Sequence, residues 1–278
     1  QRLATTTYAQ VVDRLSLNDQ RGAAARLDTI LRIRPDLVIL GGGTDGGASQ
    51  SVLNLLESVG LACYRMPKEQ RPEVLFVGNQ SLVDEVDRAI GSLVHLVAAP
   101  NIRPSLEVEQ LSAAQTQLAQ IYRSVKIRTV PGAHELDSWA GGRLMPAASA
   151  FGRMICFLDL IIDSSKGALG IHIGASATVA AASFADEYAL GVYPYLGLGK
   201  NLPEILKHTT LEEITRWMMV PVPEDDLRDY IYNKAIHPAT LPVTAEALAI
   251  EQALARVAMQ IALKKISSSF PRKGAYPG

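Results

Sequence analysis

Three short apolar runs, each followed by an amphipathic stretch, constrain the fold of this chain more than any other feature. The runs occupy residues 36–40, 73–77 and 93–98. The helical patterns that follow them occupy residues 49–59, 81–90 and 106–122. Continuously apolar strands that alternate with helices indicate a parallel sheet with both faces covered. The pattern therefore predicts an α/β fold that contains a doubly wound, Rossmann-like unit.

Helical spacing also precedes the first apolar run. From Thr7 to Arg34, apolar residues recur at intervals of three and four. This spacing predicts two helices, the second beginning near Asn18 and Asp19 and ending before Pro35.

The second half of the chain has a different pattern. A polar stretch with glycine and proline, residues 130–146, predicts a boundary between two domains, residues 1–131 and 132–278. The strongly apolar helix expected at 147–162 should be buried. Two apolar runs around a small-residue turn, between 167 and 183, predict a β-hairpin. The remaining elements are expected at residues 190–195 (a strand) and at 202–207, 211–218, 224–235 and 245–267 (helices).

Composition excludes several classes of function. The 278 residues carry 27 Lys and Arg against 28 Asp and Glu, a net charge of −1 that does not suit a general nucleic-acid binder. Cys63 and Cys156 lie too far apart for a disulfide framework or a zinc ribbon, which favours a cytoplasmic location. The longest run without formal charge, 167–185, contains glycines and polar residues, so we expect no membrane span. The chain begins with Gln1 instead of Met, and we expect it to be a piece of a longer protein.

The strongest local signal is the segment Gly41–Gly47, with the sequence GGGTDGG. It follows a predicted strand and opens a helix, so its backbone amides could approach a phosphate or a carboxylate. The alternative is a tight turn in which Asp45 caps the next helix. The binding candidates in this segment are Gly42, Gly43, Thr44, Asp45, Gly46 and Gly47.

Two further segments carry weaker signals. The predicted hairpin turn offers Gly174, Ser176 and Thr178 as groups that could surround a phosphate, and an ordinary hairpin explains the spacing equally well. Gly197 and Gly199 are a second candidate turn, for which a simple strand-to-helix connection is the favoured explanation. The histidines show no spacing of metal ligands, and no catalytic triad is evident, so neither a metal site nor catalytic residues are predicted.

These segments together resemble a known family. Residues 35–47 resemble the Gly-Gly-Thr-Asp-Gly-Gly segment of the glutamate mutase accessory proteins, the MutL (GlmL/MutL) family of cobalamin metabolism. Residues 170–179 and 191–199 are similar to that family's second phosphate loop and its following Asp-Leu-Gly turn. The resemblance covers most of the chain, and only the first segment is specific on its own.

The resemblance implies an actin-like (ribonuclease H-like) ATPase fold, related to Hsp70, in which two similar halves clamp ATP and magnesium. Residues 132–278 would then form a partial actin-like domain with a helical carboxyl end. The implied partner is an adenosylcobalamin-dependent mutase, for which such proteins act as chaperones or reactivators that exchange damaged cofactor.

Four positions depart from the family pattern. His172, Ala177 and Val179 replace an Asp, a Thr and an Asp of the second phosphate loop, and Tyr195 replaces the Asp of the Asp-Leu-Gly turn. An imidazole does not replace a carboxylate as a magnesium ligand. We therefore expect this fragment not to hydrolyse ATP by itself.

Three hypotheses follow. The first is a fragment of a MutL-type accessory protein with ATPase ancestry. The second is a non-enzymatic scaffold, or pseudo-ATPase, that binds a partner protein. The third is a binding module for a small molecule or anion around residues 41–47.

Overall fold

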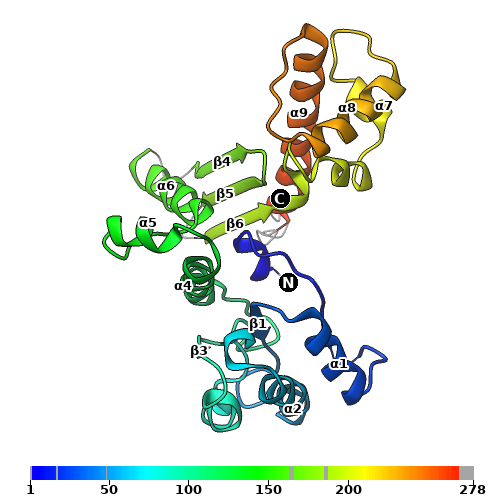
Figure 1. The fold of residues 1–278 in the computed structure, drawn as a ribbon. Helices are drawn as coiled ribbons and strands as arrows, with labels where there is room; N and C mark the ends of the chain where they lie inside the picture. Colours follow the sequence, from blue (N-terminus) through cyan, green and yellow to red (C-terminus); the bar gives the residue numbers. More distant parts are fainter. Residues whose placement is uncertain (1, 17, 48, 163–165, 185–186, 269–278) are drawn as a thin grey trace. The chain divides into compact units, whose positions relative to one another are not determined.

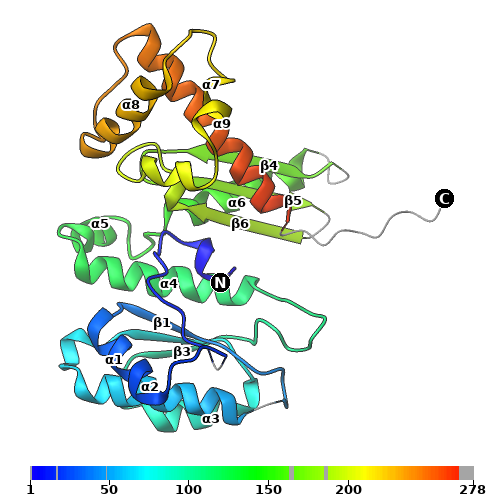
Figure 2. The ribbon, with the colours of Figure 1, turned by 90° about the vertical axis from the view of Figure 1, so that its right-hand side faces the viewer.

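The computed structural model describes residues 2–16, 18–47, 49–162, 166–184 and 187–268. Backbone contacts divide the chain into two compact units. Unit 1 comprises Gln1–Ala4 and Ala9–Pro146, and unit 2 comprises Thr5–Tyr8 and Ala147–Gly278. Each unit has its own sheet and its own core, and each is described by itself below (Figures 1 and 2).

Unit 1 contains the parallel sheet that the three apolar runs predict. Its strands β1 (Leu37–Leu40), β2 (Glu73–Phe76) and β3 (Leu96–Ala98) are hydrogen-bonded in that order. Both β1–β2 and β2–β3 pairs are parallel, with Leu37 opposite Glu73 and Val74 opposite Leu96. All four residues of β2 are buried, as the central position of this strand requires.

Helices cover both faces of this sheet. One face packs against α2 (Gln50–Arg65) and α3 (Val83–Val86), and a π-helical turn at Asp87–Gly91 follows α3. The other face packs against α4 (Ser112–Thr129). Alternate residues of β2, and Val77 directly after it, supply the two cores: Val74 and Phe76 contact the α2 side, whereas Leu75 and Val77 contact the α4 side. The predicted α/β class with a sheet covered on both faces is therefore confirmed.

Two helices flank this layered core. Helix α1 (Ala23–Ile33) packs against α2, and α5 (Ala133–Trp139) packs against α4. Arg123 of α4 and Asp137 of α5 join the second pair through an ion pair at 2.5 Å, with the Arg123 Nε also donating to Asp137.

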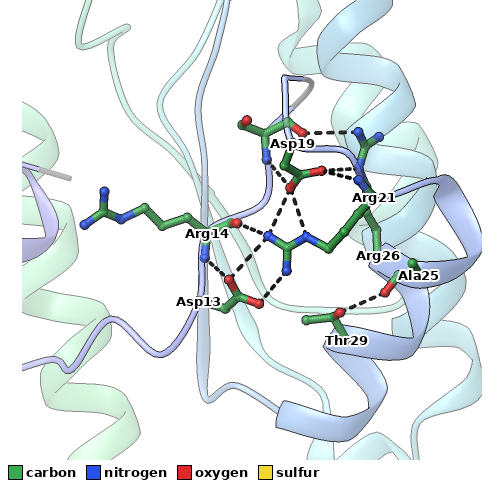
Figure 3. Close-up of polar contacts among 8 residues, drawn as sticks. Asp13, Arg14, Asp19, Arg21, Ala25, Arg26 and Thr29 are labelled. Carbon is green, nitrogen blue, oxygen red and sulfur yellow. Dashed lines mark hydrogen bonds and ion pairs between the residues drawn. The ribbon is translucent and has the colours of Figure 1, made fainter.

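The prediction of helix from Thr7 onward is wrong for residues 7–16 and 18–22. Figure 3 shows why: Arg21 donates to the carboxylates of Asp13 (2.7 Å) and Asp19 (3.1 Å) and to the Arg14 carbonyl. Asp19 also accepts from the Ser16 amide at 3.0 Å, which closes a local turn. Short polar side chains that bond neighbouring backbone compete with the helix, so α1 begins only after Gly22.

Unit 2 contains an antiparallel sheet. Strands β4 (Ala168–Ile173), β5 (Thr178–Phe184) and β6 (Glu187–Tyr193) are adjacent in chain order. The pairing of Ile173 with Thr178 confirms the predicted hairpin. Helix α6 (Ala147–Ile161) covers one face, and α9 (Ala245–Ser267) crosses the other (Figure 2). The small residues Ala180–Ala182 of β5 are buried between the two helices.

The carboxyl-terminal part of unit 2 is helical, as predicted. Short 3-10 helices at Pro194–Leu196 and Leu202–Lys207 lead to α7 (Leu211–Thr215) and α8 (Glu224–Ile236), which pack with α9. Thr244 caps α9 by accepting from the Ala247 amide at 3.1 Å. Among the described residues, no helix has both the length and the hydropathy needed to cross a membrane.

The expectation that the apolar helix 147–162 is buried is only half right. Helix α6 packs one face on the sheet, where Gly152 and Gly170 permit close approach to Tyr188 and Ile155. Its other face exposes large apolar side chains: Met154 (51%), Phe157 (58%), Leu160 (79%) and Ile161 (58%). Apolar content alone does not distinguish a helix covered on all sides from one with an exposed apolar face.

Candidate functional site

The loops that follow the three strands of unit 1 meet at the carboxyl edge of the parallel sheet. They are the glycine-rich loop after β1, the Gly78–Asn79–Gln80 turn after β2, and the segment from Ala99 to Pro104 after β3. The carboxyl edge is where open α/β sheets bind their ligands. The glycine-rich segment Gly41–Gly47 therefore lies at the edge where a sheet of this type binds ligands.

Asp45 joins the three loops. Its Oδ1 accepts from the Gln80 amide at 2.9 Å and from Asn101 Nδ2 at 2.9 Å, and its own amide donates to the Pro104 carbonyl at 3.0 Å. These bonds, first that from Gln80 and then that from Asn101, lower the pKa of the Asp45 carboxyl. Asp45 does not cap the next helix, because the N-cap of α2 is Ser49, which makes no side-chain capping bond.

Two buried asparagines support this arrangement. Asn101 is 2% exposed and also donates to the Gly43 carbonyl at 3.0 Å. Asn79 is 1% exposed, and its Oδ1 accepts from the amides of Gly46 and Ser81, both at 3.1 Å. Buried amide side chains with satisfied partners fix loop geometry, so the glycine loop is held by side chains from the two neighbouring loops.

Glycines at this edge of the sheet are required for two different reasons. Gly43 (φ 72°) and Gly46 (φ 71°) have left-handed backbone conformations that other residues rarely adopt. Gly78, in the next loop, permits close packing instead, because a Cβ there would lie 2.7 Å from the carbonyl oxygen of Gly42.

Some backbone amides of the loop remain available to a ligand. The amides of Asp45, Gly46 and Gly47 donate within the protein. For Gly42, Gly43 and Thr44, the described part of the chain supplies no acceptor to the backbone N–H. These amides precede the amino terminus of the 16-residue helix α2, whose first turn adds partial positive charge. The arrangement could hold an anionic group.

The hairpin turn in unit 2 is built differently. The Gly174 amide donates to the Ala177 carbonyl at 3.0 Å, and the turn then accepts bonds from the following loop. Leu198 donates to the Gly174 carbonyl (3.0 Å) and Gly199 to the Ala175 carbonyl (2.9 Å). The structure therefore brings Gly174, Gly197 and Gly199 together through backbone packing.

The two candidate hydroxyls of this turn have different environments. Thr178 is 0% exposed, and its Oγ1 donates to the Leu196 carbonyl at 2.8 Å. Ser176 is exposed at the tip of the turn. Of the two, only Ser176 is accessible to a ligand without a rearrangement of the protein.

Two of the positions that depart from the family pattern, His172 and Tyr195, carry aromatic rings that contact other aromatic side chains. His172 is exposed on β4, its ring is 6.3 Å from that of Phe151, and its Nε2 lies beside Gly174. Tyr195 is half-buried against Tyr193 and His208. Burial, followed by the effect of Tyr193, raises the pKa of Tyr195 to about 12, so its hydroxyl is neutral at physiological pH.

A family model described as MutL protein matches residues 1–271. The chain belongs to the MutL protein family. Among curated proteins, Protein MutL of Clostridium tetanomorphum is 25% identical over 116 residues, which are 41% of this chain and 24% of that protein. The match thus spans about a quarter of the relative's length. No solved structure matches the chain.

The side chains of this MutL-family chain do not suit magnesium at the hairpin turn. Magnesium prefers carboxylate oxygens and water, and the turn offers an imidazole, a buried hydroxyl and one exposed serine. Within the described ranges, no group of three or more His, Cys, Asp or Glu side chains could hold a metal ion.

Sequence reasoning missed the residues that position the glycine loop in this MutL-family chain. The side chains of Asn79 and Asn101 and the backbone amide of Gln80 bond to it, and none of these residues was a candidate. A signal was present, because these polar residues lie within three positions of the ends of the second and third apolar runs. Parallel strands end at the same edge of a sheet, so such residues converge.

Proposed function

We propose that this chain is part of an accessory protein that reactivates an adenosylcobalamin-dependent mutase such as glutamate mutase. The observation that carries this proposal is the MutL family match over residues 1–271. The likeness to Protein MutL of Clostridium tetanomorphum supports it. The role of such a protein would be that of a chaperone that permits exchange of damaged cobalamin.

Within this role, the glycine loop of unit 1 would bind an anionic group of a nucleotide. Gly42, Gly43 and Thr44 supply backbone amides, and the loop is preorganised by Asp45, Asn79 and Asn101. The hairpin turn of unit 2, with Gly174, Ser176, Thr178, Gly197 and Gly199, would be the remnant of a second phosphate loop. Since His172 replaces a carboxylate there, the chain would not hydrolyse ATP by itself.

Calorimetry with ATP, with and without magnesium, tests the nucleotide part of the proposal. We expect binding by the 278-residue chain and loss of affinity in a Gly43→Val variant, whose side chain would crowd the amides of Gly42, Gly43 and Thr44. Ser176→Ala is the matched control in the other loop. Absence of binding, together with no gain in His172→Asp, would contradict a nucleotide site.

A reactivation assay tests the partner. Glutamate mutase inactivated during turnover would be mixed with the chain, ATP and fresh adenosylcobalamin, and recovery of mutase activity would be followed. The assay should be repeated with the longer natural protein if the 278-residue chain alone is inactive. No recovery with either protein would count against the accessory role.

The exposed apolar face of α6 favours a second candidate function, that of a scaffold or pseudo-ATPase that binds a protein partner. Met154, Phe157 and Leu160 are each more than half exposed on this helix. Contiguous exposed apolar side chains mark interaction surfaces in soluble proteins. Phe157→Ser with Leu160→Ser would abolish mutase binding under this hypothesis, whereas ATP affinity would be unchanged.

A further inference from the structure

A second polar cluster lies at the opposite, amino-terminal edge of the parallel sheet in unit 1. Its centre is Glu73, the first residue of β2, which is 4% exposed. One carboxylate oxygen accepts from Arg128 Nη1 at 2.9 Å, and the other pairs with His95 Nδ1. Arg128 comes from the last turn of α4, and His95 directly precedes β3. Three elements distant in sequence therefore converge on one buried carboxylate.

A cavity of about 230 Å³ adjoins this cluster. Four of the residues that line it carry or can acquire positive charge: Lys68, Arg71, His95 and Arg128. Glu73 is the one carboxylate in the lining, so the net charge is +2 when His95 is neutral. This local excess contrasts with the net charge of −1 of the whole chain.

The half-buried Arg71 contributes to this excess of positive charge, and its hydrogen-bond partners are neutral. Its Nε donates to the Met66 carbonyl (3.2 Å) and its Nη1 to the Leu93 carbonyl (3.0 Å). Among the described residues, no carboxylate lies within ion-pair distance of Arg71. A partly buried cation is usually paired, and here the partners are neutral.

His95 lines the cavity, and its Nδ1 pairs with the Glu73 carboxylate. Because an ionised carboxylate only accepts hydrogen bonds, the proton of neutral His95 resides on Nδ1. The side chain is 66% exposed, and among the described residues its Nε2 has no hydrogen-bond partner. The arrangement thus combines a fixed imidazole with guanidinium groups that favour oxyanions.

We propose that this cavity binds a small phosphate-bearing ligand through Arg71, Arg128, Lys68 and His95. The charge of +2 matches a phosphate dianion better than a carboxylate monoanion. The volume lies below the roughly 300–1,000 Å³ of sites for drug-sized molecules, which suits a small ligand. This site is separate from the glycine loop, which lies at the other edge of the sheet.

Titration of the 278-residue chain with inorganic phosphate at constant ionic strength, followed by NMR, tests the proposal. We expect saturable shifts in the signals of His95 and its neighbours. Arg71→Gln and Arg128→Gln should each weaken phosphate binding about tenfold, since each removes one charge-assisted contact. Arg32→Gln, an equal change of charge on the exposed surface of α1, should leave the affinity unchanged.

The competing explanation is that the cluster only holds Glu73 in place. In that case phosphate would not bind saturably, or the Arg128→Gln and Arg32→Gln variants would have equal affinity, and either result overturns the proposal. Arg71→Gln could also disturb the Met66 and Leu93 loops, so His95→Gln provides an independent variant, with an expected loss of about threefold. Acetate that binds as tightly as phosphate would refute the preference for a dianion.

Discussion

The glycine loops of the two units differ in what holds them. In unit 1, side chains from neighbouring loops hold Gly41–Gly47, and three of its backbone amides have no acceptor among the described residues. In unit 2, backbone packing against Gly197 and Gly199 holds the hairpin turn, and its threonine is buried. Glycines therefore form a loop with unpaired amides in one unit and permit a closed, backbone-packed turn in the other.

The largest expected effect that distinguishes the two loops is that of a methyl group at Gly197. A Cβ there would lie 2.6 Å from the Ala175 carbonyl oxygen and 2.6 Å from the Ser176 carbonyl carbon, and neither backbone atom can yield cheaply. Gly197→Ala should lower the free energy of unfolding of unit 2 by about 3 kcal/mol or more. Gly46→Ala, with open space around the added Cβ, should cost unit 1 only about 1–2 kcal/mol of backbone strain.

Urea denaturation followed by tryptophan fluorescence measures both changes. Each unit contains one tryptophan, Trp139 in unit 1 and Trp217 in unit 2, so variants with one of them replaced by Phe report each unit separately. Equal losses of stability in Gly197→Ala and Gly46→Ala would remove the distinction between a closed turn and an accessible loop.

The second effect concerns the side chains that hold the loop of unit 1. Asn101→Ala removes the bonds to the partly buried Gly43 carbonyl and to Asp45, and it leaves a gap where a 2% exposed side chain stood. We expect a loss of about 2–4 kcal/mol in the free energy of unfolding of unit 1. The midpoint of the unfolding transition seen by Trp139 should shift to a lower urea concentration, whereas the midpoint seen by Trp217 should not change. A loss below 1 kcal/mol would indicate that the loop holds its shape without these bonds.

The fold was more predictable than the contacts that shape the site. The apolar runs predicted the strands because burial on both faces leaves a continuous apolar signature. Residues 7–16 and 18–22 were mispredicted as helix, because spacing of apolar residues gives no sign of the Asp13–Arg21 and Asp19–Arg21 ion pairs that hold this segment. Asn101 reaches Gly43 across 58 positions of sequence, and no local pattern encodes such a contact.

The third effect separates the two hydroxyls of the hairpin turn. Thr178→Val removes a buried donor to the Leu196 carbonyl and should cost about 1–2 kcal/mol of stability in unit 2, measured through Trp217. Ser176→Ala, at an exposed position, should change stability by no more than about 0.5 kcal/mol. A reversed order would mean that the serine, and not the threonine, has the structural role.

The smallest effect is a pH dependence confined to unit 1. Because hydrogen bonds from Gln80 and Asn101 lower the pKa of Asp45 in the folded chain, ionised Asp45 stabilises unit 1 above the unfolded pKa near 4. This contribution is lost as the pH falls through the lowered folded pKa. Asp45→Asn lacks the titration, so its deficit in stability relative to the wild type should be largest near neutral pH and should shrink toward pH 3.

Unfolding of both proteins in urea at a series of pH values, read from Trp139, measures this deficit. The Asp137 carboxyl also titrates in unit 1 with a lowered pKa, mainly through its bond from Arg123, and it is present in both proteins. Its contribution therefore cancels in the comparison. A deficit that is the same at pH 7 and pH 3 would show that Asp45 holds the three loops through its shape and hydrogen bonds. The charge of Asp45 would then have no part in the difference between the two glycine loops.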